Sequence, residues 1–344
     1  MDTLATHDRY FVQRKGCTGM LGLSSYQKGT AALRMLSYGS AADSMDEYVR
    51  MRGSTVSKTL QHFTRGIIAA YSPTYMRHPT SDDMVRILAL SEKRGFPGMP
   101  GSIDCCKWVW KNFPTAWHGP YQGKEGVTSV TPEAIADQAL WIWHAFFGMP
   151  GCNNNINVLE ASLLLNNIAN GNYPPPVEYS IMGVKRNVPY WLADGIYPKW
   201  PVFVHTVAEP LTEKEKCMTR HQEAARKDVE REFGVLKSKW NIISRPGRFW
   251  GTSFMHDVMN CCIILHNMCA EDRQDDNDPH FREQPFSRVV IGNDATPLWG
   301  EQGNTVGPAT APVGSFSALY ATSAKTKDHQ GYMRTRALII DHRW

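Results

Sequence analysis

The chain lacks long hydrophobic runs and an N-terminal apolar segment. Its longest apolar stretch, ALWIWHAFFGMPG, is interrupted by His144 and ends in Gly and Pro, short of the roughly 18 apolar residues of a membrane span. The N-terminal residues MDTLATHDRYFVQRKG are charged and have no apolar core of the kind found in secretion signals. We therefore expect a soluble protein with no membrane partner.

Regular cysteine motifs and common phosphate-binding or hydrolase motifs are absent too. The eight cysteines form no C-x-x-C pair and no regular framework, which favours a reduced intracellular compartment over a disulfide scaffold. No Gly-rich phosphate loop, G-x-S-x-G turn or H-E-x-x-H pair occurs. These absences exclude the usual sequence signatures of P-loop enzymes, serine hydrolases and zinc proteases.

Enough apolar sequence is present for a sizeable core. The chain has 344 residues, 42% hydrophobic and 11% aromatic, which suits one large domain with a smaller one, or two medium domains. The net charge of +4 is too small to indicate nucleic-acid binding by itself. Its distribution is more informative, because residues 216–248 contain nine basic and four acidic side chains. Such a basic stripe is typical of a phosphate-binding face, and equally of a solvated helix.

Residues 220–240, RHQEAARKDVEREFGVLKSKW, carry this stripe on a predicted amphipathic helix. Apolar side chains recur at helical spacing in Val229, Phe233, Leu236 and Trp240. Glu230 lies at the border between the apolar stripe and the basic face. Two interpretations are open for Glu230: an ordinary i,i+4 ion pair with Arg226, or a carboxylate with a chemical function.

The N-terminal region predicts three helices, at 27–39, 41–49 and 53–71. The third has an apolar face and an opposite polar, basic face. That second face contains Lys58, Thr59, His62 and Arg65. This pattern fits a helix-turn-helix that binds DNA through Lys58, His62 and Arg65, and it also fits an ordinary helical subdomain.

From residue 95 the pattern changes to strands. We predict strands at 98–110, 128–137 and 139–148, a helix at 154–168, a fourth strand at 188–198 and a helix at 253–273. Pro132 weakens the second strand, because proline cannot complete the hydrogen bonds of a central strand. After about residue 272 the sequence loses periodicity, so we expect 272–344 to be mostly a flexible tail.

Two carboxylates coincide with the predicted strands. Asp104 lies among apolar residues inside the first strand, and Asp194 lies at the end of the fourth. A carboxylate inside an apolar strand is costly unless it is paired or binds a metal. If these strands are neighbours, both carboxylates converge at one edge of the sheet, and Glu230 on the later helix could supply a third. Each Asp alone could instead be a turn or cap residue.

Several segments together resemble one family of transposases. RGFPGMPGSIDC, LWIWHAFFGMPG, NNINVL, LADGIYPKW, QEAARKDVEREFGVL and CCIILHNM resemble the PIF/Harbinger-type DDE transposases, and more narrowly their plant-transposon-protein branch. The resemblance covers about residues 27–272, and the segment around DVEREFG is highly specific. It implies an α/β fold with a ribonuclease-H-like catalytic core, a mixed sheet flanked by helices, preceded by a small all-α helix-turn-helix region.

The resemblance also implies a site and a division of the chain. The DDE triad falls on Asp104, Asp194 and Glu230, which would bind Mg²⁺ or Mn²⁺ and cut and join DNA. Arg226, Lys227 and Arg231 would then contact DNA phosphates. The expected parts are an N-terminal segment (1–26), a helix-turn-helix region (27–94), the catalytic domain (95–271) and the tail (272–344). A Myb-like partner protein, self-association and a nuclear location follow from the resemblance alone.

One residue departs from the family pattern. Asn155 stands where the family usually has Asp, and an amide lacks the charge that a divalent ion favours. If the second ligand follows the fourth strand, Asp194 is that ligand and Asn155 is auxiliary. If position 155 is itself a ligand position, the chain has lost a ligand. The second hypothesis is therefore a catalytically inactive DNA- or chromatin-binding protein on the same fold.

Other clusters are better explained as core. Cys262, His266 and Cys269 could form one face of a zinc site, but they share their helix face with apolar residues. His144 lies in an aromatic strand, where a satisfied core histidine is the simpler interpretation. Five tryptophans could stack on unpaired bases, but their alternating positions favour the core. These are Trp108, Trp110, Trp117, Trp141 and Trp143.

Overall fold

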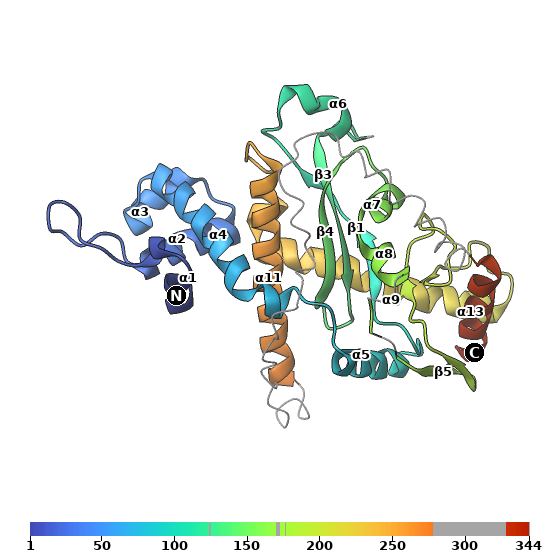
Figure 1. The fold of residues 1–344 in the computed structure, drawn as a ribbon. Coiled ribbons are helices and arrows are strands. Elements are labelled where there is room, and N and C mark those ends of the chain that lie inside the picture. The colour runs from blue at the N-terminus through green and yellow to red at the C-terminus, as the bar shows by residue number, and fades with distance from the viewer. Residues whose placement is uncertain (124, 170–172, 176, 278–327, 344) are drawn as a thin grey trace.

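The computed structural model describes residues 1–343 except 124, 170–172, 176 and 278–327. A central sheet lies between a group of N-terminal helices and a helix near the C-terminus, with long helices beside it (Figure 1). The protein is therefore mixed α/β with a mixed sheet flanked by helices, as the sequence indicated.

The part of the chain before the sheet is helical. Its α-helices are α1 (Asp2–His7), α2 (Ser25–Tyr38), α3 (Asp46–Val49), α4 (Gly53–Tyr75) and α5 (Ser81–Lys93). The three helices expected within 27–71 are present as α2, α3 and α4. Gly39 ends α2 in the left-handed conformation that glycine adopts readily. The first residues pack onto this group through Leu4 and Phe11, which are buried.

One sheet organises the rest of the molecule. Its strands are β1 (Ser102–Cys105), β2 (Trp108–Val109), β3 (Ser129–Ala136), β4 (Ile142–Pro150), β7 (Trp191–Leu192) and β8 (Phe203–Val204). β1 and β2 both pair antiparallel with β3, and β3 pairs antiparallel with β4. On its other side β1 pairs parallel with β7, which pairs parallel with β8. The three predicted early strands thus form a meander, followed by two parallel strands.

Pro132 lies in a central strand, contrary to the expectation that such a strand would exclude it. Between Thr131 and Glu133 the register with β4 shifts, since their partners Met149 and Phe146 are three residues apart. This irregularity relieves the requirement for an N–H at that position. The carbonyl of Pro132 still accepts a hydrogen bond from the backbone of Cys106, at 2.9 Å.

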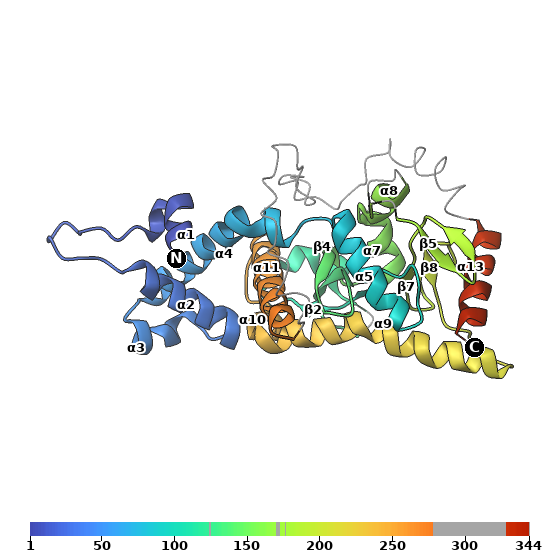
Figure 2. The same ribbon diagram turned by 90° about the horizontal axis from the view of Figure 1, so that it is seen from below.

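Helices cover both faces of the sheet. On one face, Ile103 and Ile135 share a hydrophobic cluster with Leu159 and Leu164, which belong to α7 (Asn155–Ala161) and α8 (Leu164–Ala169). The other face is covered by α9 (Glu213–Lys239), α10 (Asn241–Ser244) and α11 (Thr252–Asn277). In Figure 2, α9 runs along one side of the sheet from α10 to the C-terminal helix.

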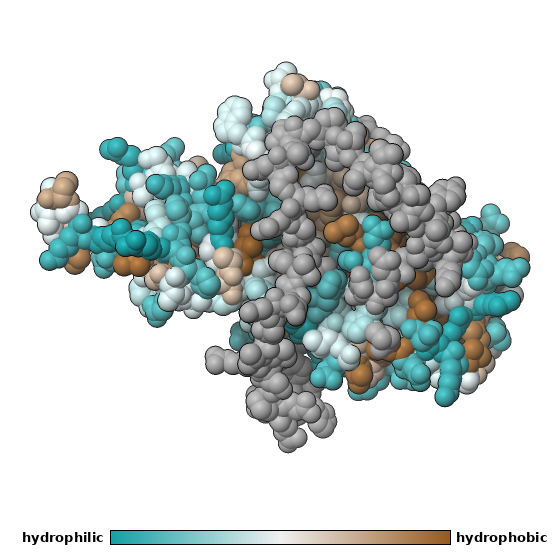
Figure 3. Space-filling model, in the orientation of Figure 1, coloured by the Kyte–Doolittle hydropathy of each residue, from teal (hydrophilic) through white to brown (hydrophobic). Residues whose placement is uncertain are grey.

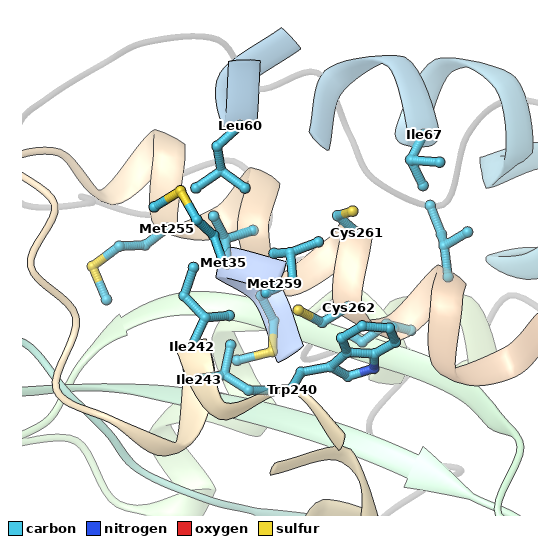
Figure 4. Close-up of a cluster of buried hydrophobic side chains, with 14 of the residues drawn as sticks. Met35, Leu60, Ile67, Trp240, Ile242, Ile243, Met255, Met259, Cys261 and Cys262 are labelled. Carbon is cyan, nitrogen blue, oxygen red and sulfur yellow. The ribbon is translucent and has the colours of Figure 1, made fainter. Parts of the chain in front are cut away.

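A continuous hydrophobic cluster joins the N-terminal helices to the sheet domain. Figure 4 shows Met35, Leu60 and Ile67 from α2 and α4 facing side chains of α10 and α11. These partners include Ile242, Ile243, Met255, Met259, Cys261 and Cys262. The helices expected at 27–71 are therefore packed directly onto the sheet domain in this structure.

Several local expectations need correction. The helix expected at 154–168 is two helices, α7 and α8, because the chain is extended at Ser162. The fourth strand is reduced to the two residues of β7. The Pro- and Asn-rich loop after α8 leads into an unpredicted hairpin of β5 (Tyr179–Ile181) and β6 (Val184–Arg186).

The expected flexible tail contains an ordered helix. α13 (His329–His342) packs on the β8 side of the sheet and buries Tyr332, Thr335 and Ile339. These three residues lie at i, i+3 and i+7, a helical stripe that the Gly- and Pro-rich sequence before it obscured. The expectation is therefore wrong for α13, and 278–327 lie outside the described residues.

The surface is mixed in character. On the face seen in Figure 3, small hydrophobic patches are scattered among hydrophilic side chains. Among the described helices, none has an apolar stretch long enough and sufficiently free of charge to span a membrane.

Candidate functional site

The first and fourth predicted strands are neighbours, which brings Asp104 and Asp194 to one edge. Ser102 of β1 pairs in parallel with Leu192 of β7. Two residues further along each strand, the same register leads to Asp104 and Asp194. Since side chains alternate along a strand, both carboxylates belong to the face covered by α9. The condition on which the three-carboxylate hypothesis depended is therefore met for these two residues.

α9 is fixed to this edge at two points. The backbone N–H of Val229 donates to the hydroxyl of Ser102 in β1, at 3.2 Å. The buried side chain of Gln222 donates to the carbonyl oxygens of Ala193, at 3.3 Å, and Val204, at 3.0 Å. Gln222 thus attaches α9 to the parallel strands beside Asp194.

Gln222 is a residue that sequence reasoning missed. It lies seven positions before Val229, on the same helix face as the apolar stripe, and is fully buried. A polar side chain at a predicted core position was the available signal. The stripe itself is confirmed, because Val229, Phe233, Leu236 and Trp240 are all buried.

Glu230 is held by an arginine that also reaches Asp104. Nη1 of Arg226 lies 2.6 Å from Oε1 of Glu230 and 3.8 Å from Oδ2 of Asp104. The i,i+4 ion pair is therefore present, and the same guanidinium bridges two of the three candidate ligands. The side chain of Glu230 is 43% exposed, whereas those of Asp104 and Arg226 are mostly buried.

Asn155 also contacts Asp104. It is the first residue of α7, whose preceding Asn154 caps the helix by accepting from the backbone of Asn157. Nδ2 of Asn155 donates to Oδ1 of Asp104 across 3.1 Å. An aspartate here could not donate as a carboxylate, and would add a second negative charge beside Asp104.

The electrostatics of Asp104 reflect this crowding. Burial raises the pKa of Asp104 above its ordinary value of 3.8, and the charges of Glu230 and Asp194 raise it further. The backbone N–H of Cys105 and the guanidinium of Arg226 lower the pKa. The charges of Glu230 and Asp194 therefore both act on Asp104, and a cation beside Asp104 would favour its ionised form.

Asp194, like Glu230, is accessible to solvent. It follows β7 and is exposed, and its Oδ1 accepts a hydrogen bond from the backbone of Gly195 at 2.7 Å. In the part of the chain that the structure describes, no three His, Cys, Asp or Glu side chains are grouped closely enough to hold a metal ion. Glu230 is directed to Arg226 instead.

The residues expected to bind DNA on α4 do not form one open face. His62 is stacked on Tyr10, and its Nδ1 lies 2.6 Å from the Asp8 carboxylate. Nε of Arg65 lies 3.1 Å from Asp257 of α11. Lys58 is exposed and has no acidic partner among the described residues.

Near the carboxylates, the basic residues of α9 differ in availability. Lys227 is exposed, whereas Arg231 lies 2.9 Å from the buried Asp228. Arg94, at the end of α5, also pairs with Asp228, at 2.5 Å. The i,i+3 pair of Asp228 with Arg231 could be read from the sequence, but the contact with Arg94 depends on the fold.

The clusters assigned to the core are confirmed as core. Cys262 and His266 are fully buried, and His266 Nε2 lies 2.7 Å from the Leu140 carbonyl. His144 is buried and lies 3.2 Å from Glu133. Four of the five tryptophans noted above are buried and Trp117 is partly buried. All eight cysteines are free thiols.

Comparison with known proteins gives one match. The model of the family described as plant transposon protein matches residues 73–277, which is more than half of the chain. The matched segment contains Asp104, Asp194 and Glu230, and it excludes α1 to α3, most of α4, and α13. No curated protein and no solved structure matches the chain significantly.

Proposed function

The chain belongs to the plant transposon protein family, and we propose that it is a metal-dependent DNA endonuclease and strand-transferase of transposon origin. The observation that carries this proposal is the register of β1 and β7, which brings Asp104 and Asp194 together beneath the helix that bears Glu230. These residues match the DDE triad that the resemblance to PIF/Harbinger-type transposases implies.

The strand order supports a ribonuclease-H-like core. From one edge, the order is β4, β3, β1, β7 and β8, with β2 continuing along β3. An antiparallel meander is followed by two parallel strands on the other side of β1. Of the proposed ligands, Asp104 lies in β1, Asp194 lies just after β7, and Glu230 lies on α9, which packs against both strands.

The donor set fits a hard divalent cation such as Mg²⁺ or Mn²⁺. Asp104, Asp194 and Glu230 offer carboxylate oxygens, the ligands that these ions prefer, and Asn155 offers an amide oxygen. Arg226 already occupies a cationic position between Asp104 and Glu230, so positive charge is favourable there. When bound, the ions would supply an activated water or 3′-hydroxyl and stabilise the leaving oxygen of a phosphodiester.

Arg226 would act in two ways in this scheme. It pairs with Glu230 and offsets the charge of Glu230 and Asp104 while no other cation does so. Releasing Glu230 would free the guanidinium for a phosphate of the bound DNA. Lys227 and Arg231 on the same helix would contact neighbouring phosphates.

The N-terminal helices and cellular setting remain part of the proposal. α2, α3 and α4 are proposed to form the helix-turn-helix region, with Lys58 as its most available cation. His62 and Arg65 would need to leave Asp8 and Asp257 to contact DNA. A nuclear location, a Myb-like partner and self-association are proposed on the resemblance to PIF/Harbinger-type transposases alone.

A second candidate function is supported by Asn155 and Glu230. The amide at position 155 and the pairing of Glu230 with Arg226 both suit a stable fold without bound ions. A DNA- or chromatin-binding protein without catalysis would retain the basic surfaces and need no cation. Cleavage of DNA distinguishes the two candidates.

The test is nicking of supercoiled plasmid DNA with Mn²⁺. We expect the wild-type protein to nick DNA, and Asp104→Ala, Asp194→Asn and Glu230→Gln to lose that activity. Glu223→Gln is the matched control, because Glu223 is an exposed carboxylate on the same helix. Equal nicking by the wild type and Asp104→Ala would reveal a contaminant. Absence of nicking by both proteins, with DNA binding retained, would favour the second candidate function.

A further inference from the structure

The loop between α10 and α11 is rigidly attached to the edge of β2. Gly247 forms a parallel bridge with Trp110 and exchanges backbone hydrogen bonds with Val109 and Lys111, at 2.7 and 2.8 Å. Three side chains of the β2 region add further bonds to carbonyl oxygens of this loop. They are Trp108 to Arg245, Trp110 to Phe249 and Asn112 to Arg248, at 2.9, 2.7 and 2.7 Å.

This rigid loop presents one large aromatic side chain to solvent. Trp250 is 78% exposed, whereas Trp108 and Trp110, which fasten the loop, are buried. A tryptophan held this far out of the core on an ordered backbone is available for contact with another molecule. Because the loop is already fixed, little backbone freedom is lost when that contact forms.

The surroundings of Trp250 are basic. Residues 105–123 and 233–256, which meet at this loop, contain six basic residues and no Asp or Glu. Lys111 and Arg248 are exposed, and neither has an acidic partner among the described residues. α11 begins two residues after Trp250, so the positive end of its dipole adds to this potential. The partner should therefore carry negative charge.

The loop and Asp104 lie along one edge of the segment that forms β1 and β2. β7 pairs with this edge at Ser102, two residues before Asp104, and Gly247 bridges the same edge further along, at Trp110. Six residues separate Asp104 from Trp110, a distance of roughly 20 Å along an extended chain. That is about six base steps of a DNA strand.

We propose that Trp250, with Arg248 and Lys111, forms a stacking site for an unpaired DNA base near the end of the substrate. The indole would stack on the base, and the two cations would contact flanking phosphates. This inference rests on the proposed function, since it gives the DNA substrate of that reaction a second contact on the protein. It differs from the carboxylate site in needing no metal ion.

The test is DNA binding by the full-length protein in EDTA, followed by fluorescence anisotropy. Two probes are compared: a blunt duplex, and the same duplex with a short single-stranded tail containing 2-aminopurine. We expect the wild type to prefer the tailed probe. Trp250→Ala should weaken tailed binding by about 5- to 150-fold, the range for one stacked base, with little effect on the blunt duplex. Trp250→Phe should retain most of the preference.

Leu211→Ala is the control, because Leu211 is an 86% exposed apolar residue just before the N-terminus of α9, whereas the loop follows the C-terminus of that helix. Quenching of 2-aminopurine by the wild type but not by Trp250→Ala would support stacking directly. Equal loss on both probes, no loss on either, or a change of oligomeric state in Trp250→Ala would overturn the inference. Tail preference without nicking in Mn²⁺ would instead reject the proposed catalysis and keep the stacking site. Absence of all DNA binding by the wild type would overturn both.

Discussion

The side-chain amide of Asn155 donates a hydrogen bond to the carboxylate of Asp104 across 3.1 Å. This contact links the first residue of α7 to the first strand of the sheet, and it lies beside the proposed metal ligands. Asn155, the residue that departs from the pattern of the PIF/Harbinger-type transposases, is therefore in direct contact with a proposed metal ligand. Changing this one residue therefore tests whether the amide supports the fold, the cation or both.

Asn155→Asp should destabilise the protein without divalent ions and increase its response to them. Losing a hydrogen bond to a charged group costs about 1.5–3 kcal/mol, and the new charge repels Asp104. Mn²⁺ should restore the free energy of unfolding, and bind more tightly than in the wild type, because one more carboxylate is available. Denaturant unfolding with and without Mn²⁺ measures both effects.

Asn157→Asp provides the control for this change. Asn157 is exposed on the same helix, so its substitution should alter stability by less than about 0.5 kcal/mol and leave the response to Mn²⁺ unchanged. An Asn155→Asp protein whose stability is insensitive to Mn²⁺ would argue against a cation at this edge.

The raised pKa of Asp104 predicts a pH dependence of stability. A carboxyl whose pKa is higher in the folded protein binds its proton more tightly there. Its contribution is therefore fully present below about pH 3.8 and is lost as pH rises through the higher folded pKa. Relative to Asp104→Asn, the wild type should lose stability as the pH rises above about 4 when no divalent ion is present.

Urea unfolding of both proteins across this range checks the prediction. The difference between the two curves isolates Asp104 from the other titrating groups. Because a bound cation favours the ionised carboxylate, saturating Mg²⁺ or Mn²⁺ should reduce the slope of the difference. If the wild type instead gains stability relative to Asp104→Asn as the pH rises, the pKa of Asp104 is lowered in the folded protein.

The sequence predicted the buried face of α9 better than it predicted the strand lengths. Val229, Phe233, Leu236 and Trp240 repeat at helical spacing, so the buried face of α9 could be identified from local pattern alone. The pairing of β1 with β7 could be stated only as a condition, because strand pairing depends on contacts between residues that are distant in sequence. The two-residue length of β7 was not predictable, since the apolar pattern around it continues into a loop.

Side-chain partners were the least predictable feature. Arg226 was visible as an i,i+4 partner of Glu230, but its approach to Asp104 requires the packing of α9 across β1. The contact between His62 and the Asp8 carboxylate likewise depends on how the N-terminal segment folds back onto α4. Periodicity identifies a polar helix face, but it does not reveal what covers that face.

Gln222→Leu should loosen the junction of α9 with the strands beside Asp194. The substitution leaves the carbonyl oxygens of Ala193 and Val204 without the donor that Gln222 provides. The Val204 carbonyl keeps the N–H of Ala193 as a donor, and leaving the Ala193 carbonyl without its donor costs about 1–3 kcal/mol. We expect that loss in denaturant unfolding, together with reduced Mn²⁺-dependent nicking. Glu223→Leu, at the exposed neighbouring position, should change neither measurement by a comparable amount.

Ile339→Ala tests whether α13 is an integral part of the sheet domain. Ile339 is fully buried in a cluster with Phe96, Tyr190 and Val204, so the substitution leaves a cavity beside the parallel strands. Truncation of a buried Ile to Ala costs about 2–5 kcal/mol. Since β8 pairs with β7, the loss should also reduce the order of the strand that leads to Asp194.

Met333→Ala is the matched control on the same helix, because Met333 is 50% exposed. Thermal unfolding and hydrogen exchange of residues 191–204 distinguish the two variants. Ile339→Ala should lower the melting temperature and speed exchange there, whereas Met333→Ala should do neither. Unchanged stability in both variants would mean that α13 is not fixed to the sheet in solution. The proposed catalytic unit would then end with the family segment at about residue 277.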